Sequence, residues 1–403
     1  MRILMIGDYK PQVGGPANVV QHIVSYLSGE HEVFVINMED PSYPRGLGHW
    51  FDGNISVWQE RLWFPGAQTV IQGAIQKTKR ALLLRDQIDL YHAHGPFEAL
   101  IGLLDRSKPL VLTFHGYPTL ESLSKGTIKP NSLKFRIYRW VERKTVERAD
   151  AIIVVGKRQK EWLINELGAD PKKLFQVSNG VDILKFRPTQ VMDHDSNFGF
   201  TKETKIIIFV KAFTAQSGIS YLIQSIPKIQ VNYPNIGLLA IGGGPLQDQL
   251  EDDIDNMNLG RAVKLIQRVS NDSIPQYLNK AEIFISPSIP FDKAEETFNI
   301  SLIEAMACGK PVIATAIGGP KEIIEGGDDV GILIPPKDPD AIADAVIELF
   351  NNPERAKKMG ENARKYVVST YTWEKVCLET LRIYEFANRK YSSSQQKIDW
   401  DPS

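Results

Sequence analysis

The chain has 403 residues, which exceeds one ordinary domain and predicts two, each large enough to have its own core. Hydrophobic residues make up 43% of the chain and charged residues 24%, as in a soluble globular enzyme. The net charge of −1 argues against nucleic acid as the main partner.

The first segment of the chain predicts a βαβ unit. Residues 3–6 and 32–36 are apolar strands, and Val19, Ile23, Val24 and Leu27 between them recur at helical spacing. Gly14 and Gly15 lie where this helix begins, and a backbone without side chains can approach a phosphate closely there. Ordinary turn glycines would explain the same pair equally well. The third glycine of a dinucleotide fingerprint is missing.

Residues 39–66 are rich in aromatic side chains with Pro and Gly between them: Tyr43, Trp50, Phe51, Trp58, Trp63 and Phe64. We expect an irregular, packed insertion here. The alternative is a platform for an acceptor, because aromatic faces stack on sugar rings or contact a lipid carrier.

Three histidines follow predicted strands of the first half. After a helix over about 67–85, His92 and His94 lie at one strand end, and His115 follows the strand over 110–114. The carboxyl ends of parallel strands are where substrates bind, although a structural histidine is the alternative for each of them. A metal site at His92 and His94 is disfavoured, because a third ligand is not nearby.

Residues 132–149 form a helix that carries six cations, with apolar residues interleaved among them. Such a helix can lie on anionic lipid. Most basic helices are simply solvated on one face, and Glu142 and Glu147 dilute the charge here, so we favour the solvated face.

The second half repeats the alternation of strands and helices, which predicts a second parallel sheet. Its elements are expected at 205–211, 218–231, 236–241, 245–258, 262–266, 273–280 and 282–286. Residues 242–244 are three glycines, but Gln247 stands where a nicotinamide site needs its last glycine, so that interpretation fails.

Glu296 and Glu304 are the most informative pair of residues. Glu296 falls in a loop at the carboxyl end of a strand, and Glu304 on the first turns of the next helix. Two carboxylates that flank the amides at a helix N-terminus suit a nucleotide sugar, because carboxylates accept from hydroxyls and amides bind phosphate. The alternative is a capping box from Ser301 to Glu304, in which Glu304 only closes its own helix.

The spacing of these glutamates, with Ala-Met-Ala-Cys-Gly-Lys-Pro-Val and then Gly318-Gly319 after them, closely resembles the signature of retaining glycosyltransferases of family 4. The resemblance extends to about residue 389. It implies an α/β fold of the GT-B type, in which two Rossmann-like domains face each other across a cleft and the last helix crosses back to the first domain. We expect an N-terminal domain of residues 1–182 plus 372–390, a linker over 183–204, a nucleotide-sugar domain over 205–371, and a disordered tail over 391–403.

The resemblance also implies the roles of individual residues. His115 and Glu296 would act at the donor sugar, and Glu304 would bind the ribose. The amides of Phe298, Asn299, Ile300 and Ser301 would meet the sugar and phosphate. Gly14, Gly15 and Lys211 would surround the diphosphate, with Gly243 and Arg268 beside the nucleotide. Neither a cofactor nor a metal is expected.

One departure from the family pattern affects the expected activity. Members of the family carry an Arg and a Lys that neutralise the leaving diphosphate, and this chain has Ala212 and Ser217 at those positions. Lys211 or Arg268 would have to substitute, because a departing diphosphate needs a cation. A non-catalytic nucleotide-sugar-binding module therefore remains an alternative. A nucleotide-sugar epimerase of similar fold fits the glutamates less well.

The expected partners are a nucleotide-sugar donor and a sugar or lipid-linked acceptor, in the synthesis of cell-envelope glycans or glycolipids. Cys308 and Cys377 are too few for a disulfide framework and fit a reducing cytoplasm. The chain opens directly with a strand, so we expect no signal peptide, and no apolar run approaches a membrane span. Any contact with the inner membrane face would be peripheral.

Overall fold

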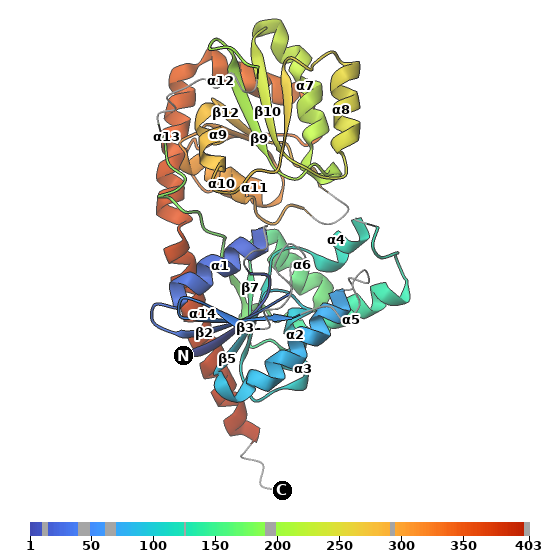
Figure 1. Ribbon diagram of the computed structural model, residues 1–403, viewed down its shortest axis with the longest axis vertical. Helices are drawn as coiled ribbons and strands as arrows, with labels where there is room; N and C mark the ends of the chain where they lie inside the picture. Colours follow the sequence, from blue (N-terminus) through green and yellow to red (C-terminus); the bar gives the residue numbers. More distant parts are fainter. Residues whose placement is uncertain are drawn as a thin grey trace. The chain divides into compact units, whose positions relative to one another are not determined.

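The structure is a computed structural model that describes residues 1–9, 15–38, 49–60, 70–124, 126–189, 199–290 and 295–398. The chain divides into two compact units (Figure 1), one formed by Met1–Gly180 with Trp373–Ser403 and the other by Val181–Thr372. Each unit contains its own parallel sheet with helices packed against it. The prediction of two Rossmann-like α/β domains is confirmed.

The first unit has an eight-stranded sheet in the order β3-β4-β2-β1-β5-β6-β7-β8. Neighbouring strands are parallel, except that β3 is antiparallel to β4. The central strands are buried apolar runs, as expected of a sheet covered on both faces. The strands are β1 (Arg2–Ile6), β2 (Glu32–Met38), β3 (His49–Asp52), β4 (Ile55–Glu60), β5 (Leu90–Ala93), β6 (Leu110–Phe114), β7 (Ala151–Val154) and β8 (Leu174–Gln176).

The helices of this unit are α1 (Gly15–Leu27), α2 (Val70–Leu84), α3 (Ile101–Leu104), α4 (Pro118–Ser124), α5 (Leu133–Arg148), α6 (Lys157–Leu167) and α14 (Trp373–Ile398). Helix α14, red in Figure 1, runs beside α1 and also packs on β6 and β7. Cys377 and Tyr384 of α14 are buried in the same core as β1. The prediction that the last helix returns to the first domain is therefore confirmed.

Helix α14 continues to Ile398, so the expectation of a disordered tail is wrong for residues 391–398. This stretch contains no Gly or Pro that would end a helix. Tyr391 Oη donates to the carbonyl of Arg106, and Ser392 Oγ donates to the carbonyl of Asn388 one turn earlier. Residues 399–403 lie outside the described part of the chain.

The sequence predicts an irregular insertion over residues 39–66. This prediction is wrong for residues 49–60, which form a hairpin that extends the sheet. Gly53 has a φ of +59°, which a two-residue turn between paired strands requires. Trp58 packs between His49, at 4.0 Å between ring centroids, and the guanidinium of Arg80, at 4.6 Å. Tyr43, Trp63 and Phe64 lie outside the described residues.

The second unit has a six-stranded parallel sheet in the order β11-β10-β9-β12-β13-β14. By position in the chain this is the order 3-2-1-4-5-6 of a Rossmann sheet, whose connections change direction between β9 and β12. The strands are β9 (Lys205–Val210), β10 (Ile236–Gly242), β11 (Val263–Gln267), β12 (Ile283–Ser286), β13 (Val312–Thr315) and β14 (Ile332–Ile334).

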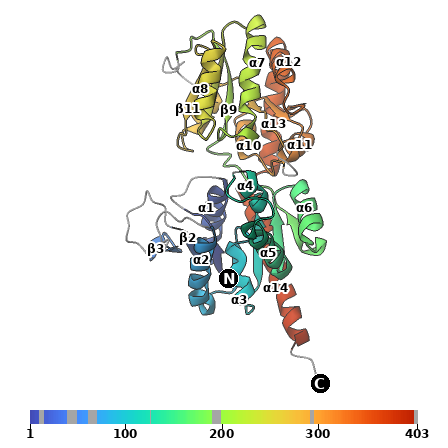
Figure 2. The same cartoon turned by 90° about the vertical axis from the view of Figure 1, so that its right-hand side faces the viewer.

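Seven helices of the described chain cover this second sheet, and α7 and α12 lie side by side in Figure 2. They are α7 (Ile219–Asn232), α8 (Gln247–Asn256), α9 (Ile274–Lys280), α10 (Ile300–Ala307), α11 (Gly318–Glu325), α12 (Pro339–Asn351) and α13 (Pro353–Thr370). Helix α10 follows β12, so the loop that carries Glu296 begins at the point where the connections change direction. Ligands bind at this point in open α/β sheets.

Candidate active site

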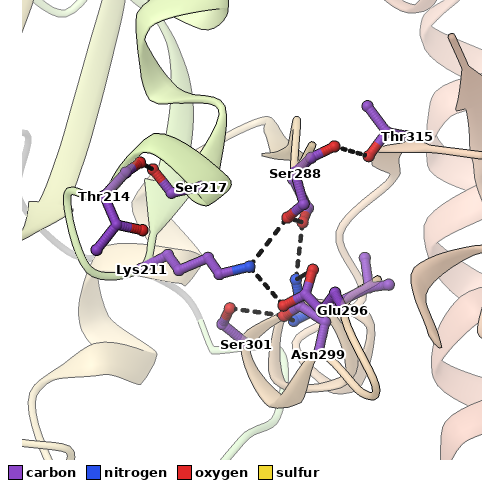
Figure 3. Close-up of polar contacts among 10 residues, drawn as sticks. Lys211, Thr214, Ser217, Ser288, Glu296, Asn299, Ser301 and Thr315 are labelled. Atoms are coloured by element: carbon purple, nitrogen blue, oxygen red, sulfur yellow. Dashed lines mark hydrogen bonds and ion pairs between the residues drawn. The ribbon is translucent and has the colours of Figure 1, made fainter. Parts of the chain in front are cut away.

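Lys211 and Glu296 form an ion pair at this point of the second sheet. Lys211 follows the last residue of β9, and Glu296 lies in the loop after β12. The Lys211 Nζ is 2.5 Å from Glu296 Oε1 and 2.9 Å from Ser288 Oγ (Figure 3). The structure thus joins two residues that the sequence assigned separately, one to the diphosphate and one to the sugar.

Asn299 holds the loop that presents Glu296. Its Oδ1 caps α10 by accepting from the Leu302 amide at 2.9 Å, and it also accepts from Ser301 Oγ at 2.9 Å. Its Nδ2 donates to Ser286 Oγ at 2.7 Å and to Glu296 Oε2 at 3.4 Å. The capping box from Ser301 to Glu304 is therefore wrong, because the cap is Asn299 and Glu304 lies inside the helix.

Ser286 and Ser288 were not predicted as site residues, although both lie in the strand-end sequence Ser-Pro-Ser. Ser286 is the last residue of β12. The carbonyl of Ser288 accepts from Thr315 Oγ1 at 2.6 Å, which connects this strand end to the next strand, β13. Polar side chains directly after a buried strand were the signal that could have identified them.

Gly318 and Gly319, at the start of α11, hold the Glu296 loop through their backbone amides. The Gly319 amide donates to the carbonyl of Glu296 at 2.7 Å, and the Gly318 amide donates to Glu295 Oε2 at 2.7 Å. A Cβ on Gly319 would lie 2.5 Å from the carbonyl oxygen of Thr297. The two glycines therefore let the backbone of α11 approach the loop closely enough to bond to it.

Glu304 is buried inside the second unit, with 6% of its surface exposed. Burial raises its pKa to about 7, while a hydrogen bond from Asn271 and the charge of Lys185 lower the pKa in part. Lys185 in turn donates to Asn271 and, at 2.7 Å, to Asp272. A further hydrogen-bond donor, such as a ribose hydroxyl, would stabilise the charged form of this buried carboxyl group.

Ala212 and Ser217, the two positions that depart from the family pattern, carry no positive charge. Ser217 is buried, and its hydroxyl donates to the carbonyl of Thr214 at 2.7 Å. Ala212 is exposed. Lys211 is therefore the charged side chain at the end of β9. Arg268 is exposed after β11, two strands away along the same sheet edge.

The structure distributes the remaining predicted donor residues as follows. Gly243 follows β10 between these two cations, and a Cβ there would meet no atom within 4 Å. Phe298 packs partly on the core, with its ring edge-on to Tyr371 at 5.7 Å between centroids, and Ile300 is the first residue of α10. Gly15 begins α1 in the first unit and is exposed, whereas Gly14 lies outside the described residues.

Three histidines of the first unit, His92, His94 and His115, lie together at the ends of β5 and β6. His94 Nδ1 is 3.0 Å from His115 Nε2, and the two rings are stacked. His92 is bonded through both ring nitrogens, to Tyr384 Oη at 2.7 Å and Thr113 Oγ1 at 2.8 Å. His92 thus has a structural environment, and His94 is the residue that touches His115.

All three histidines are neutral near pH 7. Burial lowers the pKa of His115 to about 4 and that of His92 to about 3, and it holds the pKa of His94 well below its ordinary value. A neutral His115 can donate or accept a hydrogen bond but supplies no charge. Within the described residues, no group of three or more His, Cys, Asp or Glu side chains is arranged to hold a metal ion.

Two family models match consecutive parts of the chain. The model described as Glycosyltransferase Family 4 matches residues 13–184, and the model described as Glycosyl transferases group 1 matches residues 192–366. The second match contains the whole loop and helix that carry Glu296 and Glu304.

The chain is also similar to individual proteins. An uncharacterized glycosyltransferase of Methanocaldococcus jannaschii is 29% identical over 391 residues, which are 96% of this chain and 98% of the relative. A phosphatidyl-myo-inositol mannosyltransferase of Mycolicibacterium smegmatis is 24% identical over 302 residues, which are 74% of this chain and 71% of the relative. The crystal structure of Anabaena HepE in complex with UDP and glucose aligns with a TM-score of 0.71 at 18% identity, over 95% of this chain and 98% of that chain.

The raised pKa of Glu304 predicts a pH-dependent stability. Because the folded protein binds this proton more tightly than the unfolded chain, the stabilisation is present below the ordinary pKa of Glu and is lost as the pH rises through about 7. Glu304→Gln, which is uncharged throughout, should raise the melting temperature above wild type at about pH 8, and the gain should disappear near pH 4. Thermal unfolding measured across this range tests it. The exposed control Glu325→Gln should show no such trend, and an equal gain at both ends would contradict the assignment.

The support of the Glu296 loop by Gly319 predicts a steric defect. Gly319→Ala should reduce the free energy of unfolding by about 1–3 kcal/mol, the usual cost of an added methyl group in a packed site, and should weaken nucleotide-sugar binding. Denaturant unfolding and calorimetry measure the two effects. Gly260→Ala, where a Cβ would meet no atom within 4 Å, is the matched control. Equal behaviour of the two variants would show that the loop tolerates the methyl group.

Proposed function

The chain belongs to glycosyltransferase family 4, and from this we propose that it moves a sugar from a nucleotide sugar to a sugar or lipid-linked acceptor with retention of anomeric configuration. The observation that carries the proposal is the pair of Lys211 and Glu296 at the change of direction in the second sheet. A cation for a leaving diphosphate and a carboxylate for sugar hydroxyls are the two groups that a donor site needs there.

In this proposal, donor binding rearranges the ion pair. The diphosphate competes with Glu296 for the Lys211 ammonium, because a phosphate carries more charge than a carboxylate. Glu296, still held by Asn299 Nδ2, then accepts hydrogen bonds from hydroxyls of the donor sugar. Glu304 accepts from the ribose, and the first amides of α10, from Phe298 to Ser301, face the phosphate and sugar.

The transfer step follows from these positions and from the family resemblance. The bond between the anomeric carbon and the diphosphate oxygen breaks, and the acceptor oxygen bonds to the same face of that carbon. The acceptor proton passes to the leaving phosphate, whose charge Lys211 stabilises. His115, neutral at pH 7, contributes a hydrogen bond to the donor sugar.

The names of two similar proteins support an acceptor class and a pathway. One relative, the phosphatidyl-myo-inositol mannosyltransferase, is named for a lipid acceptor, and the bound molecules in HepE are UDP and glucose. These names support synthesis of cell-envelope glycans or glycolipids, by a cytoplasmic enzyme at the inner membrane face, from a UDP-sugar or a related donor. Calorimetry against a panel of UDP-, GDP- and ADP-sugars identifies the donor.

A non-catalytic nucleotide-sugar-binding module is the second candidate. Ala212 and Ser217 favour it, since neither can replace the cation of the family pattern. A nucleotide-release assay with candidate acceptors and with water separates the two functions. Binding of a nucleotide sugar without release of nucleotide under any of these conditions would establish the binding module.

The role given to Lys211 predicts a combined loss of binding and turnover. Lys211→Met removes one charged hydrogen bond to the diphosphate, so nucleotide-sugar affinity should fall by roughly 10- to 100-fold and turnover should fall with it. Lys211→Arg should keep part of both. Arg268→Met is the matched comparison. A loss confined to the Arg268 variant would assign the diphosphate to that residue instead.

His115→Ala should lower turnover more than nucleotide affinity, because we assign His115 to the sugar and not to the nucleotide. Steady-state kinetics with the donor and calorimetry with the free nucleotide measure the two effects. His31→Ala, at the surface of the same unit, is the control. If only the melting temperature of the His115 variant changes, His115 has a structural role.

A further inference from the structure

One face of α5 exposes apolar and basic side chains together. The exposed residues recur at helical spacing and form a single stripe along the helix: Leu133, Arg136, Ile137, Trp140, Arg143, Lys144 and Glu147. Leu133 is 75% exposed, Trp140 54% and Ile137 37%. The opposite face carries the buried Tyr138, Val141, Thr145 and Val146, so the helix is firmly packed while this stripe lies in solvent.

The sequence suggests that Glu142 and Glu147 dilute the positive charge of this helix. In the structure, neither of them lies between the arginines of the stripe. Glu142 is 0% exposed and lies on the buried face, where it accepts from the Thr119 amide and pairs with Arg139. Glu147 lies at the far end of the stripe and is paired with Lys144 at 2.8 Å. Arg136 and Arg143 therefore flank Trp140 without an acidic residue between them on the stripe.

We propose that the stripe from Leu133 to Lys144 is a docking surface for an anionic lipid bilayer, with α5 lying in the plane of the interface. Trp140, Leu133 and Ile137 would enter the boundary between headgroups and acyl chains, where tryptophan is favoured. Arg136, Arg143 and Lys144 would bind anionic headgroups beside them. No helix in the described ranges is long and apolar enough to cross a membrane, so such contact would use a surface of this kind.

A second copy of this chain fits the stripe less well. In a two-fold dimer through α5 the arginines of both copies would face each other, which is unfavourable. Helix α8 offers negative charge, since Asp248, Glu251, Asp252 and Asp255 are exposed on it, but its exposed face has no apolar side chain for Trp140 or Leu133 to contact. A lipid surface satisfies both the charge and the apolar side chains.

The experiment is co-sedimentation of the full chain with vesicles of phosphatidylcholine, with and without phosphatidylglycerol. We expect binding to the anionic vesicles, much weaker binding to neutral ones, and a decrease with added salt. Arg136→Gln with Arg143→Gln should weaken binding to anionic vesicles by roughly 30-fold. Leu133→Ser with Trp140→Ser should weaken it by about tenfold or more. Nucleotide-sugar affinity should be unchanged in both, so the result does not depend on the proposed transferase activity.

Matched controls use side chains of similar exposure outside the stripe. Val231, 82% exposed on α7, and Val368 on α13 give the apolar control Val231→Ser with Val368→Ser, and Lys357→Gln with Lys358→Gln gives the charge control. Both should bind vesicles like wild type. Absence of binding to anionic vesicles at low salt would overturn the proposal. So would equal losses in the controls, or an oligomer seen by light scattering that the α5 variants dissociate.

Discussion

The ion pair between Lys211 and Glu296 is the interaction on which the candidate active site of the second unit depends. It joins residues 85 positions apart, at the ends of two neighbouring parallel strands. Both side chains are largely removed from water, so separating them without a replacement would leave an uncompensated charge. The loop after β12 is consequently fixed in position: Asn299 bonds it to Ser286, and the Gly319 amide bonds its backbone to α11. In the proposed function, a diphosphate supplies the replacement charge that lets the pair separate.

The two units present different electrostatic environments at their strand ends. The second unit offers a cation, a partly buried carboxylate and a carboxyl group whose pKa lies near 7. The first unit offers histidines that burial keeps uncharged, one of which bonds to Tyr384 of the closing helix. In the proposed function, the charged groups of the second unit suit the diphosphate, which develops negative charge as it leaves, and the neutral His115 suits an uncharged hydroxyl of the donor sugar.

The sequence alone predicted the alternation of strands and helices in both halves, because buried parallel strands are continuous apolar runs that differ clearly from amphipathic helices. It also placed Lys211 at the end of the strand expected over 205–211 and Glu296 in the loop that follows the strand expected over 282–286. It did not predict the hairpin at 49–60, where aromatic residues with glycine gave no clear period, or the continuation of α14 past residue 390. The alternative that it offered, a helix cap at Ser301, is wrong: the cap is Asn299, because either side chain can cap and only the backbone decides between them. Whether Glu142 faces the core or the solvent was likewise decided by packing against Thr119.

Ala212 and Ser217 stand where the family has its Arg and Lys, and Lys211 lies one position before Ala212. From the sequence, Lys211 is not a simple replacement for the Arg, because side chains in a strand alternate between faces and a shift by one residue reverses their direction. That objection applies only while the chain is a strand. Strand β9 ends at Val210, and Lys211 is the first residue beyond it, with its amide still bonded to the carbonyl of Ile241. A long, flexible ammonium side chain at this position reaches Ser288 and Glu296 across the adjacent strand end. The turn that follows no longer needs a lysine: Ser217 closes it through Thr214, and Gly218 accepts the close approach of Pro287 that a side chain would prevent. The structure thus retains a positive charge at the same strand end on a different residue, and in the proposed function this charge serves the leaving group.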